Sequence, residues 1–226
     1  MAHKMHFWNT TVGRKYIMGI TGLIWAGFVA AHLAGNLLIF VGEEAFNLYS
    51  HGLTSTKLVW VARGGLLAAF LAHIFAAICI TIENRRARGG QQYSVIPNAQ
   101  KKAAFASRWM AFHGSLILVF IILHLGTFTL GPAMAEGYVV THGGVEMRDI
   151  YKLVIETFRN PLYVVWYCFA LIFLGFHLSH GVYSTFQSLG LRNRVWEHTI
   201  QKFSYAYAVL IVAGFIAIPT YVYFVA

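Results

Sequence analysis

Five long apolar stretches dominate the sequence, and each is long enough to cross a lipid bilayer as a helix. A bilayer core requires about 20 consecutive apolar residues in a helix. We expect the five helices near residues 16–41, 59–82, 109–130, 162–186 and 205–225. Only 11% of the residues are charged, whereas a soluble domain carries about 25%. The chain therefore predicts an all-α fold, a single integral membrane bundle of five transmembrane helices over residues 1–226.

The charged residues between the stretches divide unevenly between the two sides of the membrane. Five crossings place the two termini on opposite sides, and the side of the N-terminus carries a large basic excess. Its basic residues are Lys4, Arg14, Lys15, Arg85, Arg86, Arg88, Lys101, Lys102, Arg108, Arg192, Arg194 and Lys202, against only Glu83 and Glu197. Because cytoplasmic loops are rich in Lys and Arg, we expect a cytoplasmic N-terminus and an outer C-terminus. The net charge of +9 is then a topology signal and not a nucleic-acid footprint.

Four histidines lie well inside four different apolar stretches: His32, His73, His124 and His177. An ionisable side chain is costly in lipid, so a histidine at such a position indicates a function. Four imidazoles are the number that two haem irons need when each takes two axial histidines. The two cysteines, Cys79 and Cys168, form no CxxCH motif, so covalent haem attachment is excluded. The pattern predicts two non-covalent haems b that carry electrons.

Two further histidines compete for these roles. His180 follows His177 on the fourth stretch, and we favour His177 as the ligand because Gly181, Ser184 and Ser188 share its helical face. Small residues there let a flat ring approach the helix. His113 precedes His124 on the third stretch, close to its cytoplasmic end.

Other readings of these histidines stay open at this stage. A single histidine inside a membrane helix is often only a hydrogen-bonded packing residue. A metal site without haem prefers several ligands within a turn or two, together with a carboxylate. No carboxylate lies well inside any of the five stretches, which also weakens the hypothesis of a proton pump. A haem-free transporter or structural membrane protein remains the alternative from another class.

Several segments resemble the dihaem cytochrome b anchor of succinate dehydrogenases and fumarate reductases with a single membrane subunit. The similar segments are AAHLAGN (30–36), EEAFNLYSH (43–51), LAHIFAA (71–77), RWMAFHG (108–114), IILHLGTF (121–128) and FHLSHGVYSTF (176–186). In the last of these, the family pattern of a histidine followed four residues later by glycine falls on His177. The resemblance extends over most of the chain, from about residue 12 to the last helix.

The resemblance implies which histidines share a haem and what the chain works with. His32 and His124 would hold the outer haem, and His73 and His177 the inner haem. A flavoprotein subunit with FAD and an iron–sulfur subunit would dock on the cytoplasmic side of the cell membrane. The exchangeable substrate would be a quinone, menaquinone in this anchor type, and the complex would link the respiratory chain to the tricarboxylic acid cycle. The chain itself would carry no chemistry on succinate.

The quinone site and the identity of the complex are less sharply indicated. Glu43, Glu44, Tyr49 and His51 lie in the first outer loop, where such groups exchange protons with a quinone as it changes redox state. Each of them is equally well explained as a solvated loop residue. A cytochrome b subunit of a hydrogenase or formate dehydrogenase is the nearest alternative complex. Those subunits have their catalytic partners outside, which the charge asymmetry and the EEAFN segment disfavour.

Overall fold

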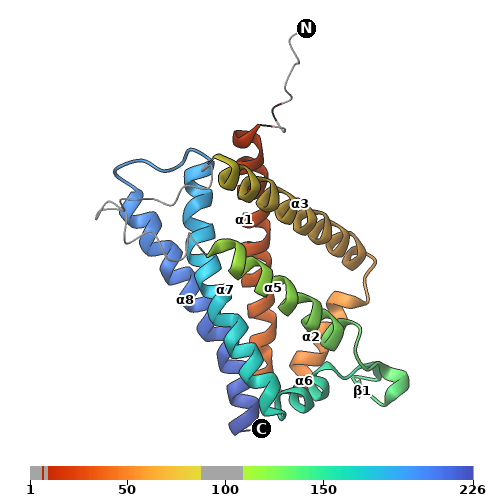
Figure 1. Ribbon diagram of the computed structural model, residues 1–226. Coiled ribbons are helices and arrows are strands. Elements are labelled where there is room, and N and C mark those ends of the chain that lie inside the picture. Colours follow the sequence, from red (N-terminus) through yellow and green to blue (C-terminus); the bar gives the residue numbers. More distant parts are fainter. Residues whose placement is uncertain (1–6, 8–9, 88–108, 226) are drawn as a thin grey trace.

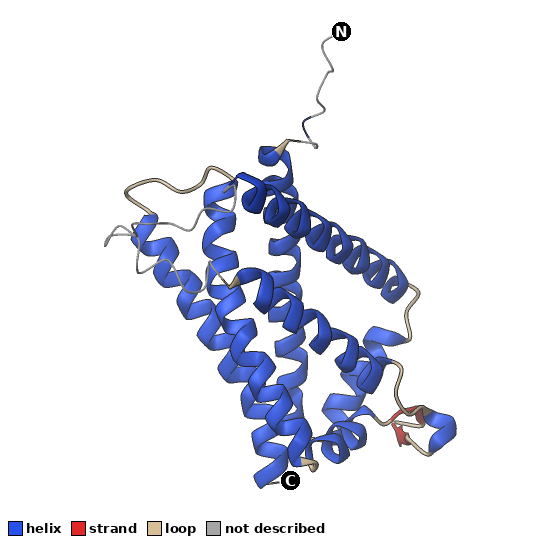
Figure 2. Ribbon diagram, in the orientation of Figure 1, coloured by secondary structure: helices blue, strands red, loops and turns tan. Residues whose placement is uncertain are grey.

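The computed structural model describes residues 7, 10–87 and 109–225, and it is an all-α bundle with one small hairpin (Figures 1 and 2). Five of its helices are long and apolar enough to cross a membrane. They are α1 (Thr11–Asn36, extended by the 3₁₀ turn η2, Leu37–Phe40), α3 (Leu58–Ala87), α5 (Met110–His124, extended by the π-helix η4, Leu125–Thr129), α7 (Pro161–Ser188) and α8 (Glu197–Phe224). The prediction of a five-helix, multi-pass bundle is confirmed.

Helix α7 lies at the centre of the packing. It runs beside α8 over much of its length and also contacts α1 and α5, while α3 packs mainly on α1. The first turn of α1 and the last turn of α8 lie at opposite ends of the bundle (Figure 1). Two buried apolar clusters, one around Tyr167 and Phe158 and one around Leu33 and Leu178, hold these helices together.

The helices extend further than the apolar stretches that predicted them. Helix α8 begins at Glu197, before the predicted residue 205, and α1 begins at Thr11, before residue 16. The Thr10 hydroxyl accepts a hydrogen bond from the Gly13 amide at 3.1 Å and caps α1. Glu197 lies in the first turn of α8, where its negative charge interacts favourably with the positive end of the helix dipole. Hydropathy locates the part of a helix that crosses the membrane, but polar residues continue the helix beyond it.

The segments near the C-terminal end of the bundle correct the sequence prediction. We expected residues 43–51 to be a loop, and they belong to helix α2 (Glu43–Thr54). Between α5 and α7 lie the short turn η5 (Met134–Glu136), the strands β1 (Val139–His142) and β2 (Val145–Arg148), and helix α6 (Ile150–Phe158). We predicted no strand. The hairpin forms because Gly143 and Gly144 both adopt positive φ, +59° and +79°, as a two-residue type I′ turn requires.

A buried polar contact fixes α2 to α6 at this end, which we call the hairpin end. Asn47 is fully buried, and its amide donates to Asp149 Oδ1 at 2.9 Å. The Asn47 carbonyl oxygen in turn accepts from the Tyr151 amide at 3.0 Å. Asp149 also caps α6 by accepting from the Lys152 amide at 2.9 Å. These bonds give both polar atoms of the buried Asn47 amide a partner, and they join α2 to α6 at the hairpin end.

Candidate functional site: two histidine pairs between helices

The four histidines singled out from the sequence meet in two pairs. His32 of α1 faces His124 of α5 with ring centroids 5.8 Å apart, and we call this the first pair. His73 of α3 faces His177 of α7 with ring centroids 6.3 Å apart, the second pair. The pairing is the one that the family resemblance implies.

The spacing within each pair suits a metal ion between the rings. A bond between a metal ion and an imidazole nitrogen is about 2 Å long, so two imidazoles on opposite sides of one ion have centroids about 6 Å apart. Both observed distances lie near this value. In the part of the chain that the structure describes, α1 and α5 are not close packing partners, and neither are α3 and α7. Each pair therefore spans a space between two helices that pack mainly on other helices.

Hydrogen bonds orient the rings of both pairs. In the second pair, His73 Nδ1 lies 3.1 Å from the Thr21 hydroxyl oxygen. The Thr21 hydroxyl donates to the Ile17 carbonyl at 2.7 Å, so its oxygen is left to accept from His73. The proton of the neutral ring then sits on Nδ1, and Nε2 keeps its lone pair. This is the tautomer that a histidine needs to bind a metal through Nε2.

Polar groups also contact both rings of the first pair. His124 Nδ1 lies 3.2 Å from the hydroxyl of Tyr167, whose side chain is buried in the core. The Asn36 amide nitrogen lies 3.3 Å from His32 Nδ1 and 3.4 Å from His32 Nε2 and donates to the His32 carbonyl at 2.7 Å, so it contacts the ring without selecting its tautomer. Metal-binding histidines typically have a hydrogen-bond partner at the ring nitrogen that does not bind the metal, and this partner fixes the orientation of the ring.

Glycines flank both rings of the second pair. A Cβ atom at Gly22 of α1 would lie 3.5 Å from His73 Cε1, and one at Gly114 of α5 would lie 3.8 Å from His177 Cε1. His177 Nδ1 is buried and has no hydrogen-bond partner among the described residues. An orphan buried nitrogen of this kind calls for an explanation, and an acceptor on a bound group would supply one.

The two competing histidines have other neighbours than the four paired rings. His180 Nε2 is 3.3 Å from the Ser184 hydroxyl, one turn further along α7. Ser184, which the sequence argument placed on the face of His177, thus contacts His180 as well, because side chains four residues apart meet on a helix. His113 is only 1% exposed and its ring packs against Phe173 and Phe176, with centroids 5.4 and 5.8 Å away.

The four candidate quinone residues do not form one cluster. Glu43 lines a polar cavity of about 270 Å³ between α2 and α6, and its carboxylate is 3.7 Å from His142 Nε2. Glu44 is exposed, and His51 lies near the C-terminus of α2. The Tyr49 ring covers Gly35 so closely that a Cβ atom at Gly35 would collide with the ring. Within the described residues, no hydrogen bond or ion pair joins any two of the four.

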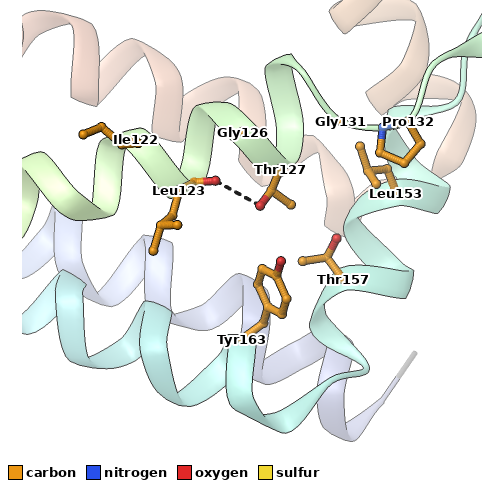
Figure 3. Close-up of a pocket in the computed structure, with 9 residues that line it drawn as sticks. All are labelled: Ile122, Leu123, Gly126, Thr127, Gly131, Pro132, Leu153, Thr157 and Tyr163. Carbon is orange, nitrogen blue, oxygen red and sulfur yellow. Dashed lines mark hydrogen bonds between the residues drawn. The ribbon is translucent and has the colours of Figure 1, made fainter.

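A larger cavity opens beside the first pair, between the end of α5, α6 and the start of α7. It has a volume of about 630 Å³ and mostly apolar walls, with hydroxyl groups from Thr127, Thr157 and Tyr163 (Figure 3). The Tyr163 ring lies 6.4 Å from the ring of Tyr167, which contacts His124. The cavity is thus two side chains away from the first pair.

Sequence reasoning did not find Tyr167 or this cavity. A tyrosine inside an apolar stretch indicates only weakly that another polar side chain lies nearby, since a buried hydroxyl usually has a hydrogen-bond partner. No family model, curated protein or solved structure matches the chain. The function is therefore argued from the residues and the geometry of the two pairs.

Proposed function

We propose that the chain is the haem-containing membrane anchor of a succinate:quinone oxidoreductase, a succinate dehydrogenase or fumarate reductase. The observation that carries the proposal is the meeting of four membrane histidines in two pairs with the spacing of metal ligands. Within the described part of the chain, no three His, Cys, Asp or Glu side chains gather as metal ligands. A protein-only site needs three or four such ligands, whereas a haem brings four nitrogens of its own.

Each histidine has a distinct part in this proposal. His32 and His124 would hold the outer haem, and His73 and His177 the inner haem. The two histidines of each pair would hold the haem iron, and the haem would supply one-electron transfer when bound. Tyr167 and Thr21 would orient one ligand of each pair and keep its Nε2 available for iron.

The proposed orientation follows from the charges, with the N-terminus in the cytoplasm and the C-terminus outside the cell membrane. The basic cytoplasmic face would dock the iron–sulfur subunit, which in turn would bind the FAD-carrying flavoprotein. Of that face, Lys4, Arg88, Lys101, Lys102 and Arg108 lie outside the described residues. The hairpin end is then the outer end.

The quinone, menaquinone in this proposal, would bind near the first pair. The cavity beside Tyr163 has the volume of a small-molecule site, about 300–1,000 Å³. Its apolar walls suit an isoprenoid quinone, and its hydroxyl groups offer hydrogen bonds to the quinone oxygens. The four candidate quinone residues would act at a distance from the quinone ring, by exchanging protons at the outer surface. They are Glu43, Glu44, Tyr49 and His51.

Replacing Tyr167 by phenylalanine should change the outer haem alone. The ring would still pack against Phe120, Phe128 and Phe158, but His124 would lose its acceptor. A histidine without that acceptor is a weaker base and stabilises ferric iron less, so the midpoint potential of the outer haem should rise. A redox titration followed by absorbance measures both haems. Tyr151→Phe, which removes a tyrosine hydroxyl elsewhere at the hairpin end, is the matched control and should shift neither potential.

Adding substrates to membranes that contain the whole complex tests the function. Succinate should reduce the haems under anaerobic conditions, and fumarate should reoxidise them. Reduction by hydrogen or formate, but not by succinate, would assign the chain to the alternative respiratory complexes. A purified chain without haem absorption would favour the transporter hypothesis.

A further inference from the structure

One side chain of the hairpin holds the C-terminal end of the α5 segment. Arg148 Nη1 donates to the Phe128 carbonyl at 3.0 Å, Nη2 to the Gly131 carbonyl at 3.1 Å, and Nε to the Pro132 carbonyl at 2.9 Å. All three guanidinium nitrogens thus bind backbone oxygens at the end of one helix. The charge favours this position, because the C-terminus of a helix is the negative end of its dipole.

The helix end that Arg148 binds has an unusual conformation. Immediately after His124 the helix widens to the π-helix η4, and the Leu130 amide donates to the Leu125 carbonyl at 2.8 Å. At Gly131 the chain turns so tightly that a Cβ atom would collide with the Thr127 carbonyl oxygen. A helix end leaves its last carbonyls without intrahelical donors, and π-helical turns are frequent at functional sites. Arg148 supplies a donor to one of these carbonyls, that of Phe128, and to two carbonyls of the turn that follows, those of Gly131 and Pro132.

The fold delivers Arg148 to this place with little freedom. It is the last residue of β2 and pairs with Val139 in the hairpin. The next residue, Asp149, is anchored by the buried contact with Asn47. Burial lowers the pKa of the Arg148 guanidinium and Glu136 acts against this, but the ordinary value is so high that the group stays charged.

The held segment contacts the first pair. The Phe128 carbonyl binds Arg148, and the Phe128 ring lies 5.3 Å from the His124 ring and 6.2 Å from the Tyr167 ring. We propose that Arg148 is a positioning residue that fixes the π-turn after His124 and so sets the orientation of His124 toward His32. The inference rests on the proposed function, since the quantity it controls is the binding of the outer haem.

The test compares three variants in the whole complex: Arg148→Gln, Arg148→Lys and, as control, Arg63→Gln. Arg63 is an exposed arginine whose guanidinium lies over Trp60 on α3, so its replacement removes the same charge elsewhere. Haem content and the potentials of both haems are measured, together with amide hydrogen exchange over residues 125–131.

With Arg148→Gln we expect faster exchange over residues 125–131 and outer-haem affinity lower by about 10- to 100-fold, as for other residues behind a metal ligand. The outer-haem potential should shift while the inner haem stays unchanged. Arg148→Lys should lie between glutamine and wild type, because an ammonium group cannot make the forked contact. Arg63→Gln should match wild type.

The outcomes separate the inference from the proposed function. A complex with two haems in which Arg148→Gln alters neither the outer haem nor the exchange would overturn the inference alone. Equal loss of both haems would also overturn it, since that result indicates general destabilisation. A wild-type complex without haem would overturn the proposed function and the inference with it.

Discussion

Replacing His177 by alanine should leave the complex with one haem per chain instead of two. His177 faces His73 across the second pair, and an iron that loses one of two axial imidazoles is held by a single protein bond. The inner haem should therefore be lost, while the first pair, built from α1 and α5, keeps the outer haem. Quantitation of extracted haem against protein measures the ratio, and the reduced-minus-oxidised spectrum shows which haem remains.

His180→Ala is the matched control for this experiment. His180 lies on the same helix and is half-buried like His177, but its ring is hydrogen-bonded to Ser184. Its removal should leave both haems with nearly unchanged spectra. Loss of a haem in His180→Ala, with two haems retained in His177→Ala, would mean that the second pair has been assigned to the wrong histidine.

Replacing His32 by alanine should separate succinate oxidation from quinone reduction. In the proposed complex, oxidation of succinate with a soluble electron acceptor would be carried out by the flavoprotein and should proceed at the wild-type rate. Quinone reduction should fall by at least about tenfold. Replacing a residue that only orients a metal ligand already lowers activity by about tenfold or more, and replacing the ligand itself should lower it further. Both rates are measured on the same purified complex, so the first serves as the internal control.

Tyr163→Phe should raise the KM for quinone without loss of haem.

An assembled His32→Ala complex that reduces quinone at the wild-type rate would contradict a quinone site at the hairpin end. The site would then have to lie at the opposite end of the bundle. There Arg14 of α1 forms an ion pair with Glu83 of α3, and the Thr11 hydroxyl donates to the same carboxylate at 3.1 Å. Arg14 and His113 would become the first residues to replace.

The sequence predicted the positions of the spanning helices well, but it did not predict which helices pack against one another. Length and apolar composition suffice for the five long helices, since lipid accepts few other structures. The position of His32 or His177 on its helix is also readable from the sequence. Which helical faces meet depends on packing between helices, so the pairing came from the family resemblance and not from periodicity.

The short elements at the hairpin end were missed for separate physical reasons. The Gly143–Gly144 turn was a readable hairpin signal, but its strands have only four residues each. Helix α2 was taken for a loop because its segment is polar, although Asn47 holds it to Asp149. The role of Arg148 depends on a π-turn and a hairpin that meet only in the folded chain. No local sequence pattern predicts such a contact.

The measurement that tests the central claim most directly is the haem content of the purified complex. Formation of the pyridine haemochrome, set against the protein concentration, gives the type and number of haems per chain. We predict two haems b, all extractable with acidic acetone, because two histidine pairs are present and the sequence has no CxxCH motif. One haem per chain, or none, would contradict the assignment of both pairs as iron ligands.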